Sequence, residues 1–120
     1  MRIHIWVLVV LLVAVPAGAH ETNGPNGGQV VDIGPFHAEL AAKGNTVDIY
    51  VTDTADKAVP AAGYKGVAIL LIGGKSERVV LEAAGGNRLT GTSGVALPQR
   101  PKGVIRLTAP DGKTIQAKYD

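Results

Sequence analysis

The chain has no cysteine among its 120 residues, which excludes disulfides, thiolate metal sites and thiol catalysis. Aromatic residues are also scarce. The only Trp and the only Met lie within the first six residues, and the remainder has one Phe and three Tyr. A core built from this chain must therefore consist mainly of Val, Ile, Leu and Ala. Without Cys or Met beyond the start, a soft copper(I) site is excluded as well.

Charge of one sign does not dominate the chain either. It has 12 Lys and Arg against 10 Asp and Glu, for a formal net charge of +2. Both signs are scattered, and no basic run is interleaved with aromatic residues. We therefore expect no binding to nucleic acid.

Residues 1–19 have the three parts of a secretory signal. Arg2 supplies a positive charge, residues 5–15 are apolar, and Ala17-Gly18-Ala19 is a small-x-small cleavage pattern. An apolar helix of this length rises only about 16 Å, half of a bilayer core, so we predict a cleaved signal and no membrane anchor afterwards. Cleavage after Ala19 is the main prediction, and cleavage after Ala17 is the alternative. Either one implies a periplasmic protein.

The rest of the chain predicts one all-β domain. Residues 20–28 are rich in Gly and Asn and predict a flexible lead-in, whereas residues 29–120 contain short Val, Ile and Leu runs closed by Gly, Pro, Asn or Asp. The predicted strands are residues 29–33, 36–42, 46–52, 66–72, 77–83, 88–92, 103–109 and 114–119. The run GVAILLIG, residues 66–73, is apolar on both faces, as in a strand covered on both sides. Seven or eight strands in about ninety residues predict an immunoglobulin-like antiparallel β-sandwich.

Catalytic combinations are few in this chain. After the signal only two histidines remain, His20 and His37, and neither Ser76 nor Ser93 lies in a G-x-S-x-G nucleophile motif. We therefore do not expect an enzyme.

Residues 36–52 predict a β-hairpin whose register can be argued from its pattern. Apolar residues occupy positions 36, 38 and 40 of one strand and positions 47, 49 and 51 of the other. Because the side-chain period is two, paired positions on a common face must have an odd sum. We predict that Leu40 pairs with Val47 and Ala38 with Ile49, with Lys43-Gly44 at the turn.

This register brings chemistry-bearing side chains together on the outer face. It places Glu39 opposite Asp48, and His37 opposite Tyr50. Facing carboxylates repel each other, and a divalent cation would relieve the repulsion. Nitrogen and carboxylate ligands suit zinc, copper(II), cobalt or nickel. The alternative is an ordinary solvated face.

Cleavage after Ala19 would add a second group of ligands. His20 would become the N-terminus, where its α-amine and ring nitrogen can chelate one ion. A second imidazole, from His37, would complete a histidine brace, which favours copper(II). The alternative is that cleavage merely happens to fall before a histidine. The candidate ligands for one divalent transition-metal ion are thus His20, His37, Glu39 and Asp48.

Three strings carry a resemblance to a known group of proteins: GPNGGQVVDIGPFHAEL, TDTADKAVPAAG and LIGGKSERVVLEAAGGNRLTGT. Together with the final hairpin, they resemble small periplasmic β-domain proteins and segments of the adaptor (membrane-fusion) subunits of heavy-metal efflux systems, over about residues 24–119. The resemblance implies a role in metal resistance, with a periplasmic or membrane efflux component as partner. It implies that His37 and Glu39 lie on an H-x-E-L strand and that His20 stands at a histidine-rich start. The chain departs from this pattern in having Asn23 before Gly24 and few histidines in the lead-in.

The sequence leaves two functions open. The first is a periplasmic metal-binding or metal-handling accessory protein linked to heavy-metal efflux. The alternative is a metal-free periplasmic protein-interaction module that uses sheet edges or loops.

Overall fold

The strands form where the alternating apolar runs lie in the sequence. The structure, a computed structural model, describes residues 22–120. Its strands are β1 (Thr22–Asn23), β2 (Gln29–Ile33), β3 (Phe36–Lys43), β4 (Thr46–Thr52), β5 (Lys65–Ile72), β6 (Lys75–Ala83), β7 (Arg88–Thr92), β8 (Lys102–Thr108) and β9 (Thr114–Tyr119). Four predicted strands have the observed bounds, and the other four differ by one or two residues at an end. The short β1 was not predicted.

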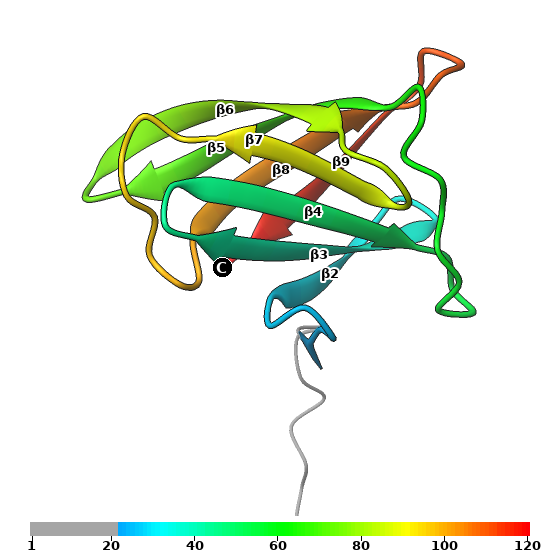
Figure 1. Ribbon diagram of the computed structural model, residues 1–120, viewed down its shortest axis with the longest axis horizontal. Helices are drawn as coiled ribbons and strands as arrows, with labels where there is room; N and C mark the ends of the chain where they lie inside the picture. Colours follow the sequence, from blue (N-terminus) through cyan, green and yellow to red (C-terminus); the bar gives the residue numbers. More distant parts are fainter. Residues whose placement is uncertain (1–21) are drawn as a thin grey trace, which may run out of the picture.

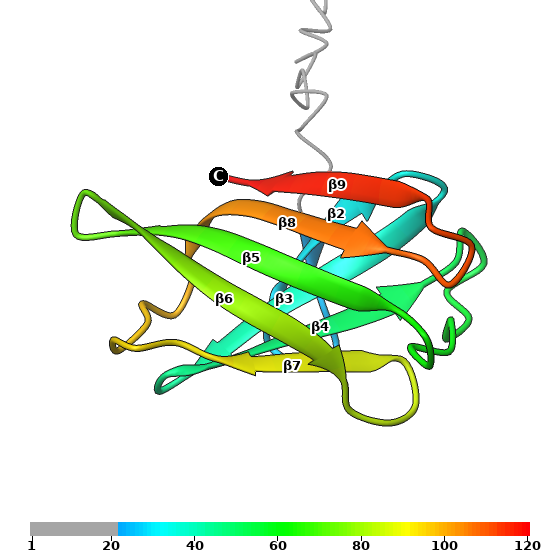
Figure 2. The ribbon, with the colours of Figure 1, turned by 90° about the horizontal axis from the view of Figure 1, so that it is seen from above.

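All of these strands belong to one antiparallel sheet, in the order β1-β2-β3-β4-β7-β6-β5-β8-β9 (Figures 1 and 2). The strand β7 pairs with both β4 and β6, so it joins the two halves that a sandwich would keep apart. The sheet then curls until its ends approach, and the Tyr119 hydroxyl on β9 donates a hydrogen bond of 2.7 Å to the Ala38 carbonyl on β3. The fold is all-β, as predicted, but barrel-like rather than clearly an immunoglobulin-like sandwich.

The barrel interior holds the aliphatic residues that the composition predicted. Inward positions of every long strand are buried, and Tyr119 is the largest fully buried side chain among the described residues. The core residues are Val31, Ile33, Ala38, Leu40, Val47, Ile49, Val51, Ala61, Ala68, Leu70, Val79, Leu81, Leu89, Ile105, Leu107, Ala117 and Tyr119. Complete burial of one Leu, Ile or Val side chain contributes about 1.5–3 kcal/mol, so these residues supply most of the stabilisation.

The predicted register of the β3–β4 hairpin is wrong by two residues. Leu40 pairs with Ile49 rather than with Val47, and Glu39 pairs with Tyr50 rather than with Asp48. The odd-sum rule holds, because it only requires that apolar side chains share a face, and a shift of two preserves that face. The turn is Gly44-Asn45, with Gly44 at φ +61°, the left-handed conformation required at the first position of a type II′ turn.

Part of the lead-in folds onto the sheet. Thr22 pairs with Val30 on β2, and the following turn is closed by a hydrogen bond of 2.9 Å from the Gly24 amide to the Gly28 carbonyl. Residues 1–19, where we predict the signal, and His20 lie outside the described residues. Between residues 22 and 120, no helix is long and apolar enough to cross a membrane.

Candidate functional site

The outer face of β2, β3 and β4 carries the described residues predicted as metal ligands. His37 lies opposite Asp32 in the β2–β3 pairing, and its Nδ1 is 2.9 Å from Asp32 Oδ1. The His37 side chain is 31% exposed. With Nδ1 held by the carboxylate, Nε2 is the ring nitrogen left to meet a ligand. An imidazole oriented by a carboxylate in this way is the common arrangement for a metal-ligating histidine.

Glu39 is buried two residues further along β3, and its carboxylate holds the lead-in turn. Oε2 accepts hydrogen bonds from the backbone amides of Asn26, at 2.9 Å, and Gly28, at 2.8 Å. Oε1 accepts a third bond, of 2.9 Å, from the Asn26 side-chain amide. A Cβ at Gly24 would overlap the Glu39 carboxyl, so a larger residue there would push the carboxylate away from these hydrogen bonds. A metal ion bound by Glu39 would have to displace these N–H donors.

Asp48 lies apart from His37 and Glu39. It faces Ala41 on β3 and Thr90 on β7, and it is four residues along β4 from Thr52, the partner of His37. Four strand residues span about 13 Å, too far for both side chains to hold one ion directly. The nearest cation among the described residues is Arg88, whose Nη1 is 4.0 Å from Asp48 Oδ1. Asp48 Oδ1 is buried, with no hydrogen-bond partner in the described part of the chain.

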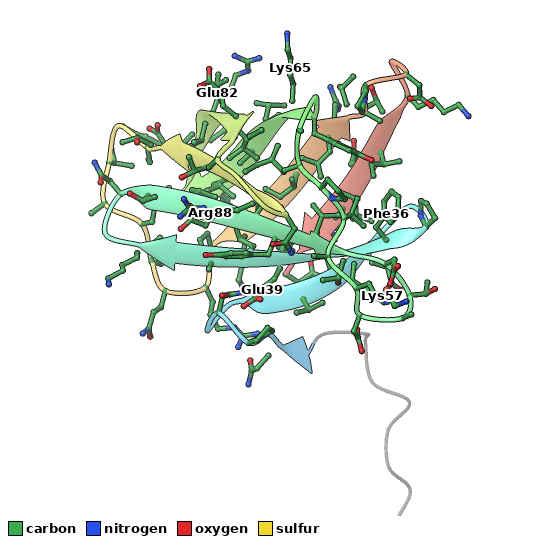
Figure 3. The ribbon with its side chains drawn as sticks, turned by 45° about the vertical axis from the view of Figure 1, so that its right-hand side comes forward. Phe36, Glu39, Lys57, Lys65, Glu82 and Arg88 are labelled. Atoms are coloured by element: carbon green, nitrogen blue, oxygen red, sulfur yellow. The ribbon has the colours of Figure 1, made fainter. Side chains whose placement is uncertain are left out.

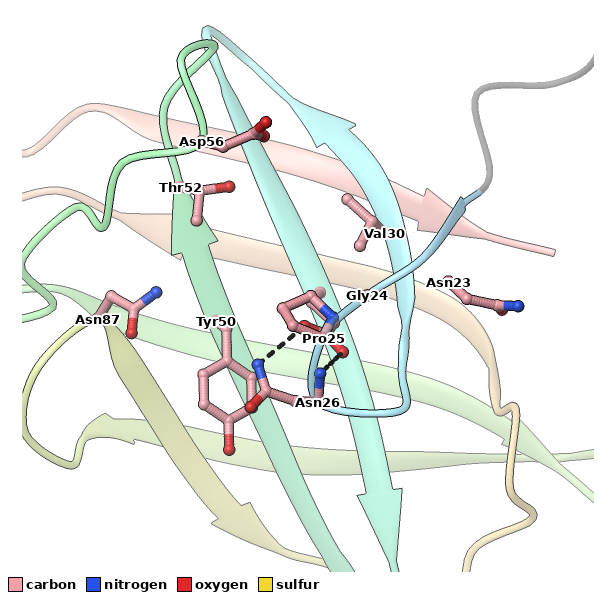
Figure 4. A pocket seen from close by; sticks show the side chains of 10 residues that line it. Asn23, Gly24, Pro25, Asn26, Val30, Tyr50, Thr52, Asp56 and Asn87 are labelled. Carbon is pink, nitrogen blue, oxygen red and sulfur yellow. Dashed lines mark hydrogen bonds between the residues drawn. The ribbon is translucent and has the colours of Figure 1, made fainter.

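Next to the Glu39 anchor, a cleft of about 450 Å³ separates the lead-in turn from the outer face of β3 and β4 (Figure 4). Apolar walls come from Pro25, Val30 and the Tyr50 ring, and polar groups come from Thr52, Asp56 and other side chains. The full lining is Asn23, Gly24, Pro25, Asn26, Val30, Glu39, Tyr50, Thr52, Asp56 and Asn87. The sequence did not predict this cleft, because a flexible lead-in would form no wall. The repeated glycines of NGPNGG, which allow close approach to the sheet, were the signal for it.

The structure thus groups His37 with Asp32 and binds Glu39 to the lead-in, and it leaves Asp48 outside both groups. Within residues 22–120, no three His, Cys, Asp or Glu side chains lie close enough together to hold a metal ion. A site of three such ligands that includes His37 would need at least one from outside residues 22–120, and His20 is the predicted candidate.

One buried group adds to the electrostatics below this surface. Burial raises the pKa of the Tyr119 hydroxyl far above its ordinary value, and the negative charge of Glu39 raises it further. Tyr119 therefore stays neutral, and its hydroxyl donates a hydrogen bond to the Ala38 carbonyl throughout the physiological pH range.

Comparisons of the chain with protein-family models, with curated proteins and with solved structures gave no match. The similarity to efflux adaptor segments accordingly stays a prediction from the sequence strings alone.

Proposed function

We propose that the chain is an exported, non-catalytic metal-handling protein that captures a divalent transition-metal ion with His37 and His20. The observation that supports this function best is the pairing of His37 Nδ1 with Asp32 at 2.9 Å. This pairing orients the imidazole on the sheet surface and directs its other nitrogen to the ligand. His37 is the central ligand, whereas Glu39 and Asp48 lie in positions that do not suit a shared ion.

Chain reach is compatible with a ligand supplied by the N-terminus. The strand β1 runs antiparallel to β2, with Thr22 beside Val30. Asp32 lies two residues beyond Val30 on β2, on the side at which the chain enters β1. His20 precedes Thr22 by two residues in the sequence. Two residues span up to about 7 Å, the same as the separation of Val30 and Asp32 along a strand. The anchoring of the turn by Glu39 would hold the start of β1 in this region.

Isothermal titration of the protein beginning at His20 with copper(II), zinc, cobalt and nickel tests the proposal. We expect one ion per chain and loss of binding in His37→Ala. Asp32→Asn should weaken binding about tenfold, because the carboxylate only orients the ring. One extra alanine before His20 should also weaken binding, since it removes the α-amine from the chelate. Binding should weaken as the pH falls, because protons compete for the imidazoles.

Asp48→Asn is the matched control, and we expect it to leave the affinity within about twofold, since Asp48 lies roughly 13 Å away along the sheet. Absence of binding to all four ions at micromolar concentration would refute a metal-handling role. Binding that survives His37→Ala but is lost in Asp48→Asn would refute this ligand set. The intact mass of the exported protein checks the start at His20.

A metal-free interaction module is the second candidate, and a separate observation favours it. Leu71 and Val80 are large aliphatic side chains that are 53% and 56% exposed on neighbouring strands. Exposed apolar groups that cluster commonly mark interaction sites.

A further inference from the structure

The outer surface of β6, β5 and β8 carries a continuous set of aliphatic side chains. On β5, Ala68 and Leu70 point into the barrel, so the alternating Val67, Ile69 and Leu71 point outward. Val80 on β6 lies opposite Val67, and Val104 on β8 lies opposite Ile69. We call these five residues the aliphatic face: Val67, Ile69, Leu71, Val80 and Val104. Figure 2 shows their three strands side by side across the surface turned to the viewer.

The strand β5 is apolar on both sides because it contributes to the core and to the aliphatic face. The sequence predicted a strand covered on both sides, and the barrel interior covers only one of them. On the other side, Ile69 is 39% exposed and Leu71 is 53% exposed. An antiparallel strand with one side in water normally has polar residues on that side. The outward side of β5 is apolar instead, and no described residue covers it fully.

Basic side chains surround the aliphatic face. Arg78 lies opposite Ile69, Arg106 opposite Val67, and Lys102 opposite Leu71. Lys118 lies opposite Val104, and Lys65 stands at the end of β5. All five are exposed. At the outward positions of β6, β5, β8 and β9, the single acidic residue is Glu82, opposite Lys65. The Lys118 ammonium also lies 3.5 Å from the exposed Asp120 carboxylate, beyond the end of β9.

At one end, the face continues into a groove of about 500 Å³. The groove is lined by Val80 of the aliphatic face together with Tyr64, Lys65 and Glu82. Figure 3 shows Lys65 and Glu82 standing at this end of the barrel. A partner could therefore insert a side chain at one end while it covers the exposed aliphatic residues along the strands.

We propose that this face docks an acidic amphipathic segment of a partner protein. The partner's apolar side chains would cover the aliphatic face, and its Asp and Glu side chains would meet the five cations of the rim. An apolar centre with complementary charges at the edge is the general arrangement of a specific protein interface. The proposal deepens the second candidate function and does not depend on metal binding.

Two other occupants fit this face less well. A symmetric contact with a second copy would bring two surfaces with the same excess of cations together, and like charges across an interface are unfavourable. The cations would suit anionic lipid headgroups, but the aliphatic face has no Trp or Tyr, the residues that contacts at a membrane interface favour, so a protein partner fits better.

A displayed library of random sixteen-residue peptides, selected on the protein beginning at His20, tests the proposal. Counter-selection uses the double variant Leu71→Ser/Val80→Ser, whose exposed positions tolerate a polar side chain without loss of core packing. We expect the retained peptides to combine several Asp or Glu with aliphatic or aromatic residues. One synthesised peptide is then titrated by NMR, and its shifts should lie on β5, β6 and β8. Its affinity should fall at least tenfold for the double variant and for Arg78→Glu/Arg106→Glu.

Val95→Ser, at a residue that is 41% exposed outside this face, and Lys57→Glu are matched controls that should change the affinity by less than about twofold. Higher salt should weaken binding to the wild-type protein and affect the charge-reversal variant less. Peptides that depend on the face but lack negative charge would refute the acidic partner while leaving the docking function intact. If no peptide distinguishes the wild type from the double variant, both fail. Binding to phosphatidylglycerol vesicles without peptide binding, or dimerisation lost in the double variant, would overturn the proposal in favour of a lipid surface or a second copy.

Discussion

Glu39 is the residue whose role differs most between sequence and structure. Its neighbours in the sequence suggested a ligand, yet its carboxylate is buried and accepts three hydrogen bonds from the lead-in turn. Hydrogen bonds to a charged acceptor are stronger than neutral ones, and each of these satisfies an N–H donor that the turn shields from water. Glu39 therefore orders the turn and forms one wall of the cleft.

Glu39→Gln should lower the free energy of unfolding by about 2–3 kcal/mol, because an amide brings its own N–H donors against those of Asn26 and Gly28. Urea denaturation measures this loss, and hydrogen exchange should show faster exchange of both amides. Glu82→Gln, at an exposed site, should cost less than about 0.5 kcal/mol. Equal costs for the two variants would contradict the anchoring role.

Tyr119→Phe should cost about 1–2 kcal/mol at neutral pH, because it removes the buried hydrogen bond from the Tyr119 hydroxyl to the Ala38 carbonyl. The pKa of Tyr119 is raised in the folded state, so the folded chain keeps a proton that the unfolded chain releases above about pH 10.0, the ordinary tyrosine value. The wild type should therefore lose about 1.4 kcal/mol per pH unit above that value, and the variant should lack this loss.

Urea denaturation at pH 7, 9 and 10.5 checks the prediction for Tyr119. Tyr50→Phe, at a tyrosine that is only half-buried, is the control. The difference in stability between wild type and Tyr119→Phe should shrink at the highest pH. A difference that stays constant across the series would show that the Tyr119 proton is not linked to folding.

At the scale of elements, backbone contacts decide how closely the strands pack. Gly103 on β8 has a φ of +151°, and a Cβ there would overlap the Ile69 carbonyl oxygen of the neighbouring β5. The strand pairing that supports the aliphatic face thus needs a glycine at this position. The β3–β4 turn is held by backbone hydrogen bonds from the loop after β7. The Gly44 carbonyl accepts from the Leu97 amide at 2.8 Å, and the Asn45 carbonyl accepts from the Ser93 amide at 2.7 Å.

Gly103→Ala should lower the free energy of unfolding by about 3 kcal/mol, through steric overlap and an unfavourable φ for a residue with a Cβ. Thermal and urea denaturation measure the change. Gly94→Ala is the matched control, because a Cβ there meets no other atom within 4 Å, and its effect should stay within about 0.5 kcal/mol. A cost below 1 kcal/mol at Gly103 would mean that β8 can move away from β5.

At the scale of the whole molecule, the single sheet and shared core should make folding cooperative but slow. The pairs β4–β7 and β5–β8 and the contact of Tyr119 with Ala38 join residues far apart in the sequence. The chain loses the entropy of loop closure before such contacts stabilise it, so folding rates fall as the sequence separation of contacting residues grows.

We therefore expect one unfolding transition, with coincident curves by far-ultraviolet circular dichroism and tyrosine fluorescence, and refolding in milliseconds to seconds. The fluorescence must come from tyrosine, since the chain beginning at His20 has no tryptophan. Separate transitions for the two signals would indicate that β2–β4 and β5–β9 fold as independent units.

The sequence by itself determined every strand of the described residues except β1, because alternation of apolar and polar residues and the Gly, Pro, Asn and Asp between them are local properties. It also determined which side chains of β3 and β4 face the core, since that depends only on a period of two. The register, the closure of one sheet into a barrel and the partners of Glu39, Asp48 and His37 were decided by the tertiary structure. These features depend on contacts between distant segments, such as the lead-in turn on Glu39 and the loop after β7 on the β3–β4 turn. No local pattern contains that information, so the side chains expected to form one polar cluster in a hairpin instead have partners on β2, on β7 and in the lead-in turn.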